Sequence, residues 1–203
     1  DNCSTPVRDA LDRVLHGRIR AETEHALVAA TYRFHTQRLT TNDLFIYTGL
    51  LAALGPRVDR PLSAWAEMFL PMSLREHLRR VTIPGPDGRD IPLVKMERTI
   101  YESTAPPPPA TPPDWLGWYL VAGVALGAVI ALLGRAASAH AKANVAVRSL
   151  LAAVGGIWGL VAGIAGVILA VLWFATDHVM AYRNLNLFQL NPLVLPLAVL
   201  LPA

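Results

Sequence analysis

Two long stretches without charged side chains dominate the C-terminal half of the chain. Residues 115–134 are 20 uncharged, mostly apolar residues, and residues 149–175 form a longer run interrupted by no charge. A helix needs about 20 apolar residues to cross the hydrocarbon core of a bilayer. Because no water satisfies backbone N–H and C=O groups at that depth, such runs have to be helical. The sequence therefore predicts two transmembrane helices.

The segment between these runs indicates their orientation. It contains three basic residues and no acidic one: Arg135, Lys142 and Arg148. Because basic residues collect in cytoplasmic loops, we expect residues 135–148 in the cytoplasm. Residues 1–104 and 176–192 then lie on the outer face of the membrane. Residues 193–203 start a third apolar run that is too short to span, so we expect the chain to continue beyond it.

Composition divides the chain in the same way. Mean hydropathy is +0.38 and hydrophobic residues make up 53%, which is too apolar for an ordinary soluble domain. Nearly all charge precedes Asp114, and the net charge of +3 is spread among acidic neighbours, so no nucleic-acid partner is expected. The histidines show no metal-ligand spacing, and neither metal nor cofactor is expected. No ionisable residue lies within either span, which argues against a channel or proton-coupled transporter.

Residues 1–104 are expected to form an α+β extramembrane domain that is mostly helical. Apolar spacing and capping residues predict five helices, at residues 7–15, 19–38, 44–54, 64–69 and 74–80. We expect the last three to be capped by Thr40 or Thr41, by Ser63 and by Ser73. Two strand-like runs, 81–83 and 91–100, flank a turn and predict a hairpin.

A proline-rich spacer and small-residue patterns complete the organisation. Residues 105–114 include six prolines and are expected to be extended, leading into an aromatic cluster typical of a membrane interface. Glycines recur at four-residue spacing in both spans: Gly123 and Gly127, then Gly155, Gly159 and Gly163. This spacing favours close helix approach. We interpret it as packing between the two spans rather than dimerisation, and the oligomeric state is left open.

Cys3 is the single cysteine and stands at the start of the first predicted helix. Asn2, Ser4 or Thr5 can cap that helix, and Pro6 suits its first turn. The positive end of a helix favours thiolate, so Cys3 is a candidate nucleophile. The alternatives are a small buried hydrophobic residue or a lipid-modified cysteine, the latter disfavoured because two residues precede Cys3.

Other polar residues are weaker candidates. His16, His25, His35 and His77 are interpreted as surface or capping residues, and Tyr32, Arg33, His35 and Arg38 as a solvated helix face rather than a site for acidic headgroups. Asp59 and Glu67 are candidate partners of an imidazole. In the second outer segment, Asp177, His178, Asn184 and Asn186 are candidates for contact with a lipid headgroup, and the alternative is an interfacial loop whose polar groups are only hydrated.

The residues around Cys3 resemble a known family. Residues 2–5 followed by 8–12 resemble the cysteine motif of the Lnb-type N-terminal periplasmic domain family. Further stretches resemble the same family: 61–71, 176–178, 184–187 and 191–193. The resemblance implies a permuted papain-like (NlpC/P60-type) fold, in which a histidine precedes the cysteine. It therefore implies that this chain is a fragment holding the C-terminal part of that fold, followed by α-helical transmembrane segments, in the bacterial inner membrane.

The resemblance also implies an activity. Cys3 would be the nucleophile of an acyl transfer on a lipid or lipoprotein at the outer face of the membrane, with Asn2 in a positioning role and the base histidine upstream. A cysteine hydrolase of the cell wall or of lipids stays open, as does a non-enzymatic membrane scaffold or envelope-binding protein. A histidine on an upstream strand would favour the enzyme.

Overall fold

The computed structural model describes residues 2–139 and 145–200. The chain forms two compact units, which interleave in sequence. Unit 1 comprises residues 1–39 and 59–111, and unit 2 comprises residues 40–58 and 112–203. The sequence predicts that residues 40–58 belong to the outer domain. In the structure they pack with the apolar C-terminal half instead.

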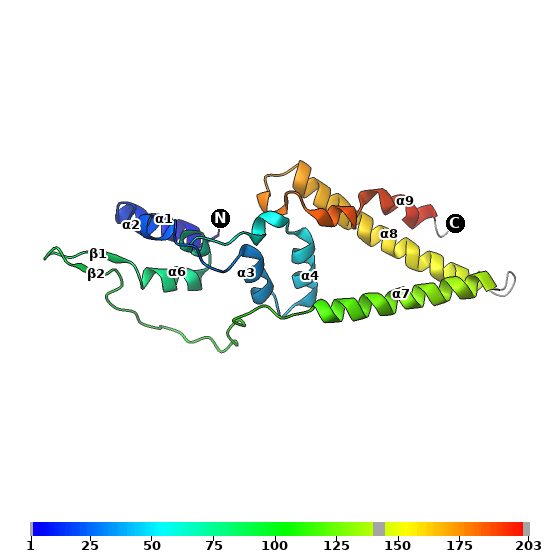
Figure 1. The fold of residues 1–203 in the computed structure, drawn as a ribbon, viewed down its shortest axis with the longest axis horizontal. Coiled ribbons are helices and arrows are strands. Elements are labelled where there is room, and N and C mark those ends of the chain that lie inside the picture. The colour runs from blue at the N-terminus through cyan, green and yellow to red at the C-terminus, as the bar shows by residue number, and fades with distance from the viewer. Residues whose placement is uncertain (1, 140–144, 201–203) are drawn as a thin grey trace. The chain divides into compact units, whose positions relative to one another are not determined.

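Unit 1 starts with three short helices (Figure 1). They are α1 (Ser4–Val14), α2 (Arg18–Thr23) and α3 (Tyr32–Leu39). The first prediction is confirmed, but the single helix predicted over residues 19–38 is wrong. Residues 26–30 are extended instead, because their backbone bonds to the 62–64 strand-like segment, with Val28 N donating to Leu62 O at 2.8 Å and Ala64 N to Ala26 O at 2.7 Å.

Two further helices and a hairpin complete unit 1. Helix α5 (Ala64–Glu67) is capped by Ser63 as predicted, since its Oγ accepts from Ala66 N at 3.1 Å. Helix α6 (Pro71–Leu78) begins with proline in its first turn, so the cap predicted at Ser73 is wrong and Ser73 is buried inside the helix.

The predicted hairpin is confirmed in unit 1. Strand β1 (Thr82–Pro84) pairs antiparallel with β2 (Asp90–Pro92), and Ile83 lies opposite Ile91. The second strand is much shorter than the run predicted over 91–100. The core of the unit is small and lies among the helices and β1: Ile19, Met68, Leu74 and Val81, with Leu15, Trp65, Leu78 and Leu93 packed against them.

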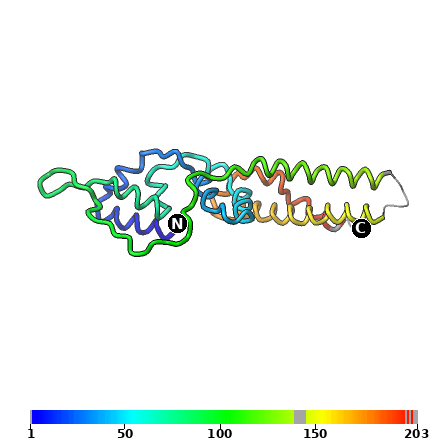
Figure 2. The backbone as a smooth tube through the Cα atoms, turned by 90° about the horizontal axis from the view of Figure 1, so that it is seen from below, coloured from blue at the N-terminus to red at the C-terminus, as the bar shows by residue number. Residues whose placement is uncertain are grey.

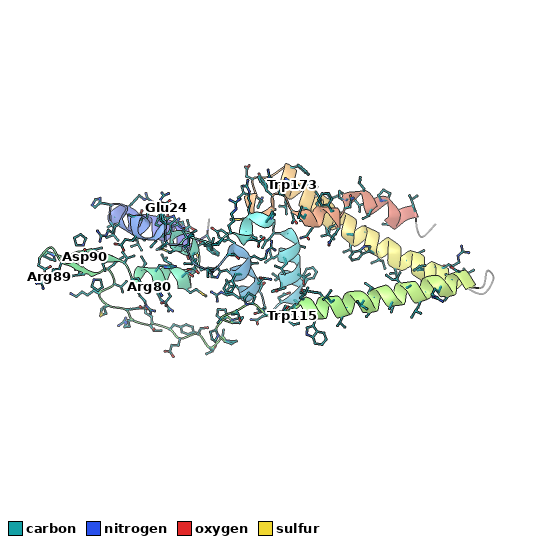
Figure 3. The ribbon with its side chains drawn as sticks, viewed as in Figure 1. Glu24, Arg80, Arg89, Asp90, Trp115 and Trp173 are labelled. Atoms are coloured by element: carbon teal, nitrogen blue, oxygen red, sulfur yellow. The ribbon has the colours of Figure 1, made fainter. Side chains whose placement is uncertain are left out.

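Unit 2 contains the membrane-spanning helices. Helices α7 (Leu116–Ala139) and α8 (Val145–Phe174) are both long and apolar enough to cross a bilayer. Both are longer than predicted, so Arg135 and Arg148 of the predicted loop lie within them, while Lys142 lies outside the described residues. Trp115 and Trp173, labelled in Figure 3, mark the ends of the two helices that are remote from the 140–144 connection. This is the pattern of an aromatic belt at one membrane surface.

The chain folds back along α8 after this hairpin. Three 3-10 turns, η2 (Val179–Ala181), η3 (Leu185–Phe188) and η4 (Pro192–Val194), lead into α9 (Leu195–Leu200), which runs beside α8 (Figures 1 and 2). The last three residues of the predicted third apolar run, 201–203, lie outside the described part of the chain. Buried Gly163 and Gly166 of α8 make room for this return, because a Cβ on Gly163 would lie 2.5 Å from the Leu195 side chain.

The glycines of α7 and those of α8 therefore have different surroundings. A Cβ on Gly123 or Gly127 would meet no atom within 4 Å among the described residues. The prediction that these glycines let α7 approach α8 closely is wrong. Helix α8 uses its small residues against the returning chain instead.

Helix α4 (Leu44–Ala53) also belongs to unit 2. Its predicted range is nearly correct, but its cap is Asp43 rather than Thr40 or Thr41. The Asp43 carboxylate accepts from Ile46 N at 2.9 Å. A short 3-10 turn, η1 (Pro56–Asp59), follows it and leads the chain back to unit 1.

Candidate functional site

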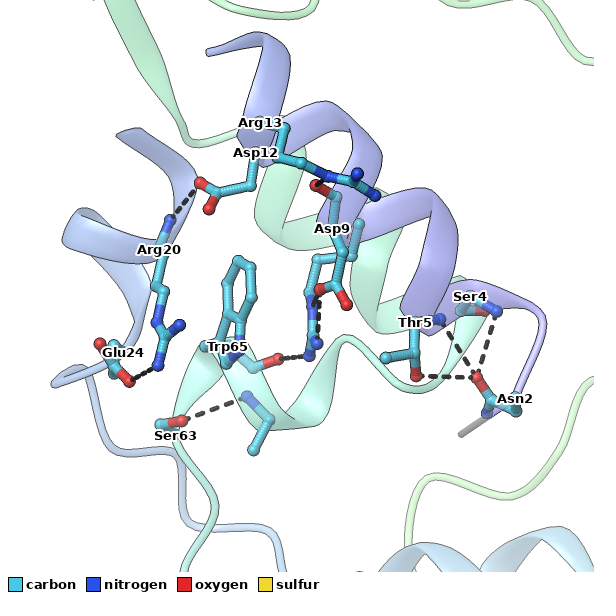
Figure 4. A network of polar contacts seen from close by, with 12 residues as sticks. Asn2, Ser4, Thr5, Asp9, Asp12, Arg13, Arg20, Glu24, Ser63 and Trp65 are labelled. Carbon is cyan, nitrogen blue, oxygen red and sulfur yellow. Dashed lines mark hydrogen bonds and ion pairs between the residues drawn. The ribbon is translucent and has the colours of Figure 1, made fainter. Parts of the chain in front are cut away.

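The Asn2 side chain organises the start of α1. Its Oδ1 accepts from Ser4 N at 3.1 Å, from Thr5 N at 3.3 Å and from Thr5 Oγ1 at 3.3 Å (Figure 4). Its Nδ2 donates to Phe69 O at 2.5 Å. Of the three predicted capping residues, Asn2 therefore caps the helix. Its bond to Phe69 also anchors the chain just before Cys3 to the turn between α5 and α6.

The Cys3 side chain is exposed, so its interpretation as a buried hydrophobic residue is wrong. Among the described residues, neither the Cys3 thiol nor its backbone N–H has a hydrogen-bond partner. The N–H groups of Ser4 and Thr5 are already occupied by Asn2. An acyl oxyanion at the thiol would therefore find the Cys3 N–H as the free first-turn donor.

A stacked arginine holds α1 against α5. Arg8 is 8% exposed, its Nη1 donates to Trp65 O at 2.9 Å, and its guanidinium carbon lies 3.9 Å from the Trp65 ring centroid. Arg20 of α2 approaches the same indole at 5.6 Å. Figure 4 shows the Trp65 ring beside Arg20. These contacts join α1 and α2 to α5 through the Trp65 indole.

A partly buried carboxylate joins two imidazoles in the same unit. Glu67 Oε1 lies 3.0 Å from His35 Nε2, and Glu67 Oε2 lies 2.7 Å from His77 Nε2. The three side chains are 15%, 4% and 10% exposed, respectively. Of the two carboxylates predicted to pair with an imidazole, Glu67 does so. Asp59 instead binds Arg33, with Nε and Oδ1 2.5 Å apart.

The protonation of His35 follows from its neighbours. Arg38 Nε donates to His35 Nδ1 at 3.1 Å, so Nδ1 is the acceptor and Nε2 carries the proton given to Glu67. Burial lowers the pKa of His35, and the Glu67 hydrogen bond only partly offsets it. His35 is therefore a neutral donor at neutral pH.

The structure corrects the histidine predictions in part. His35 and His77 are buried, so their interpretation as surface or capping residues is wrong, while His16 and His25 are exposed. The predicted solvated face of α3 is wrong for the same reason, since His35 and Arg38 belong to the buried network. No local spacing could have revealed it, because its three members come from α3, α5 and α6.

The four candidates of the second outer segment behave differently from one another. Asp177 and His178 are exposed, and His178 Nδ1 lies 3.0 Å from Thr176 Oγ1. Asn184 is 2% exposed, and both Asn184 Nδ2 and Asn186 Nδ2 donate to Ala52 O, at 2.6 and 2.9 Å. The two amides thus secure the end of α4. Asp177 and His178 stay predictions for headgroup contact.

Within residues 2–139 and 145–200, no group of three or more His, Cys, Asp or Glu side chains is arranged to hold a metal ion.

Comparison with known proteins identifies the C-terminal part of the chain. Residues 127–202 match the family described as the Lnb transmembrane domain. The match covers the second half of α7, all of α8 and the returning segment through α9. Comparisons with curated proteins and with solved structures give no match. Together with the two long apolar helices, the match indicates that this part of the chain is a transmembrane domain.

Proposed function

We propose that the chain performs cysteine-dependent acyl transfer on lipid or lipoprotein substrates at the outer face of the bacterial inner membrane. The observation that carries the proposal is the exposed Cys3 thiol at the capped start of an 11-residue helix, in a chain with an Lnb-type transmembrane domain. The resemblance of residues 2–5 and 8–12 to the Lnb-type periplasmic cysteine motif supports the same activity. Unit 1 then faces the periplasm.

The reaction divides into two steps. The Cys3 thiolate attacks the carbonyl carbon of an acyl ester, and the Cys3 N–H binds the oxyanion. Collapse of this intermediate forms a thioester and expels the lipid alkoxide, which takes the proton that the upstream histidine removed from the thiol. An amine then attacks the thioester and gives a proton to the same histidine, which yields the amide and releases the Cys3 thiolate. If water attacks instead, the products are a fatty acid and the free thiol.

The residues around Cys3 have defined parts in this proposal. The proton acceptor is a histidine that the family resemblance assigns to a position before the cysteine. Asn2 is a positioning residue, because it holds both the first turn of α1 and the Phe69 carbonyl. Asp177 and His178 are free to contact a headgroup at the membrane surface. The His35–Glu67–His77 network is assigned to the stability of unit 1.

The experiment is detection of the thioester. The protein is incubated in vesicles with a phospholipid that carries an alkyne-tagged acyl chain, and the tag is read on the denatured protein. We expect a tag that hydroxylamine removes and that is lost in Cys3→Ser. The matched control is Met96→Cys in the Cys3→Ser background, because residue 96 is 87% exposed and gives an accessible thiol elsewhere in unit 1. Equal tagging of both thiols would show non-specific acylation and overturn the proposal.

The recipient of the acyl group distinguishes the alternatives. Release of the tag only as free fatty acid would identify a lipid hydrolase, and transfer to an amine would identify an acyltransferase. If Cys3 stays untagged in protein that carries the upstream histidine, a non-enzymatic membrane scaffold or envelope-binding protein replaces the proposal.

A further inference from the structure

Helix α4 is an apolar helix between two segments of unit 1. Its ten residues, Leu44–Ala53, include no charged side chain. Four of its large apolar side chains are exposed: Leu44 50%, Phe45 89%, Ile46 48% and Leu50 38%. Tyr47, by contrast, is 3% exposed. A helix that is apolar on all sides is suited to a protein interior or to a membrane, not to water.

Contacts within unit 2 fix this helix to both arms of the transmembrane hairpin. Thr48 Oγ1 lies 2.7 Å from Tyr119 OH, in the first turn of α7. At the other end, the Ala52 carbonyl accepts from Asn184 and Asn186, which follow α8. These two amides satisfy a helix-end carbonyl that has no partner inside the helix.

Gly55 adds a close backbone contact just after α4. Its N–H donates to Met180 O at 2.8 Å, and a Cβ at this position would collide with the Tyr182 carbonyl oxygen. The chain leaving α4 is therefore seated directly on the η2 segment. Figure 1 shows α4 between the beginning of α7 and the turns that follow α8.

These attachments determine the depth of α4 relative to the bilayer. Tyr119 and residues 180–186 both lie at the end of the hairpin remote from the 140–144 connection, next to Trp115 and Trp173. These ends of α7 and α8 lie at the same membrane surface. A helix that is joined to both ends therefore lies at the depth of that surface. Its exposed apolar side chains then continue the lipid-facing surface of α7.

We propose that α4 is a third membrane-contacting element, an interfacial helix whose Leu44, Phe45, Ile46 and Leu50 side chains insert into the acyl-chain region of the phospholipid bilayer. Charged residues flank it on either side, Asp43 before it and Arg57 after it, so the charge stays near the headgroups. Lipid is the occupant because the face is continuous with the surface of a transmembrane helix. The proposal is independent of the reaction at Cys3.

The test places an environment-sensitive fluorophore at single cysteines in the Cys3→Ser background and reconstitutes the protein into phosphatidylcholine and phosphatidylglycerol vesicles. Lipids with brominated acyl chains serve as quenchers. The test position is Phe45→Cys, and the controls are Leu116→Cys at the start of α7 and Met96→Cys in unit 1, which are 64% and 87% exposed. We expect the label at residue 45 to be blue-shifted and quenched as strongly as that at 116, with no quenching at 96.

Either of two results with the cysteine variants would overturn the proposal. One is a label at residue 45 whose emission and quenching match those of the label at residue 96. The other is a disulfide between two copies at Phe45→Cys, formed in vesicles at low protein density, which would make a second copy the occupant. Unsubstituted protein provides a check that needs no variant: a phospholipid with a photoreactive acyl chain should cross-link to residues 44–53 and not to residues 85–104. Absence of adducts in 44–53, with adducts in α7 present, would also contradict it.

Discussion

Glu67 is the residue on which the small core of unit 1 depends. Its two carboxylate oxygens accept from two buried imidazoles that come from different helices. Hydrogen bonds to a charged group stabilise a fold more than neutral ones do. Three short helices, none of which would be stable alone, are thereby joined at one point.

We expect Glu67→Gln to destabilise unit 1 by about 3 kcal/mol. Glutamine replaces one acceptor oxygen by an N–H₂ group, which then faces the N–H of His35 or His77. Urea unfolding followed through hydrogen exchange of α3, α5 and α6 measures the effect. The matched control is Glu76→Gln, an exposed partner of Arg79, for which a change within about 0.5 kcal/mol is expected. Equal effects of the two variants would contradict the role of Glu67.

The pH dependence of unit 1 follows from His35. Burial lowers its pKa in the folded state below the value of about 6.5 that a free imidazole has. The unfolded chain then binds more protons, so stability is present above about pH 6.5 and is lost as pH falls through the folded pKa. The urea midpoint of unit 1 should drop on acidification, and His35→Gln should flatten that drop. Substitution of exposed His25 by Gln is the control, and a pH profile unchanged in His35→Gln would refute the prediction.

At this scale the sequence predicted local features and missed distant ones. The caps at Asn2 and Ser63 depend on residue type and on neighbours in the chain. His35 and His77 were misinterpreted because burial is decided by packing between helices, which leaves no mark at either residue. Arg8 is likewise buried by its stacking on Trp65, a contact between helices that its position in the sequence does not indicate.

The helices of unit 2 are packed by backbone approach rather than by large side chains. Gly163 and Gly166 leave space into which residues 190–195 settle. Glycine spacing indicates that some backbone comes close, but it does not identify which one. We predicted from this spacing that α8 packs against α7. The two helices do contact each other, but Gly163 and Gly166 of α8 face the returning chain.

Gly166→Val should displace the segment that leads into α9. A Cβ there would collide with the Leu190 carbonyl oxygen and lie 2.6 Å from Pro192 N, so overpacking should cost about 2 kcal/mol. Hydrogen exchange of residues 185–200 in vesicles should become faster. Gly123→Val is the matched control, because it changes helix propensity equally and meets open space. The prediction would be wrong if both variants exchanged at the rate of the unsubstituted protein.

At the scale of the whole molecule, the two spans require both of their outer ends to face the same compartment. With the basic connection in the cytoplasm, we expect Met96→Cys, in the Cys3→Ser background, to react with a membrane-impermeant maleimide on spheroplasts. Ser138→Cys, near the other end of α7, should react only after the membrane is permeabilised. The reverse pattern would invert the proposed topology and remove Cys3 from the periplasm.

The order of the two units along the chain has a practical consequence. The backbone passes between them three times, after Leu39, after Val58 and after Thr111. A protease that cuts the proline-rich stretch would therefore yield fragments that do not part. The N-terminal fragment keeps α4 and the Gly55 that follows it, and both Ala52 and Gly55 remain hydrogen-bonded to the C-terminal fragment. The two fragments of the cut protein should therefore remain associated. If residues 1–104 are expressed alone, α4 lacks the C-terminal residues that it contacts.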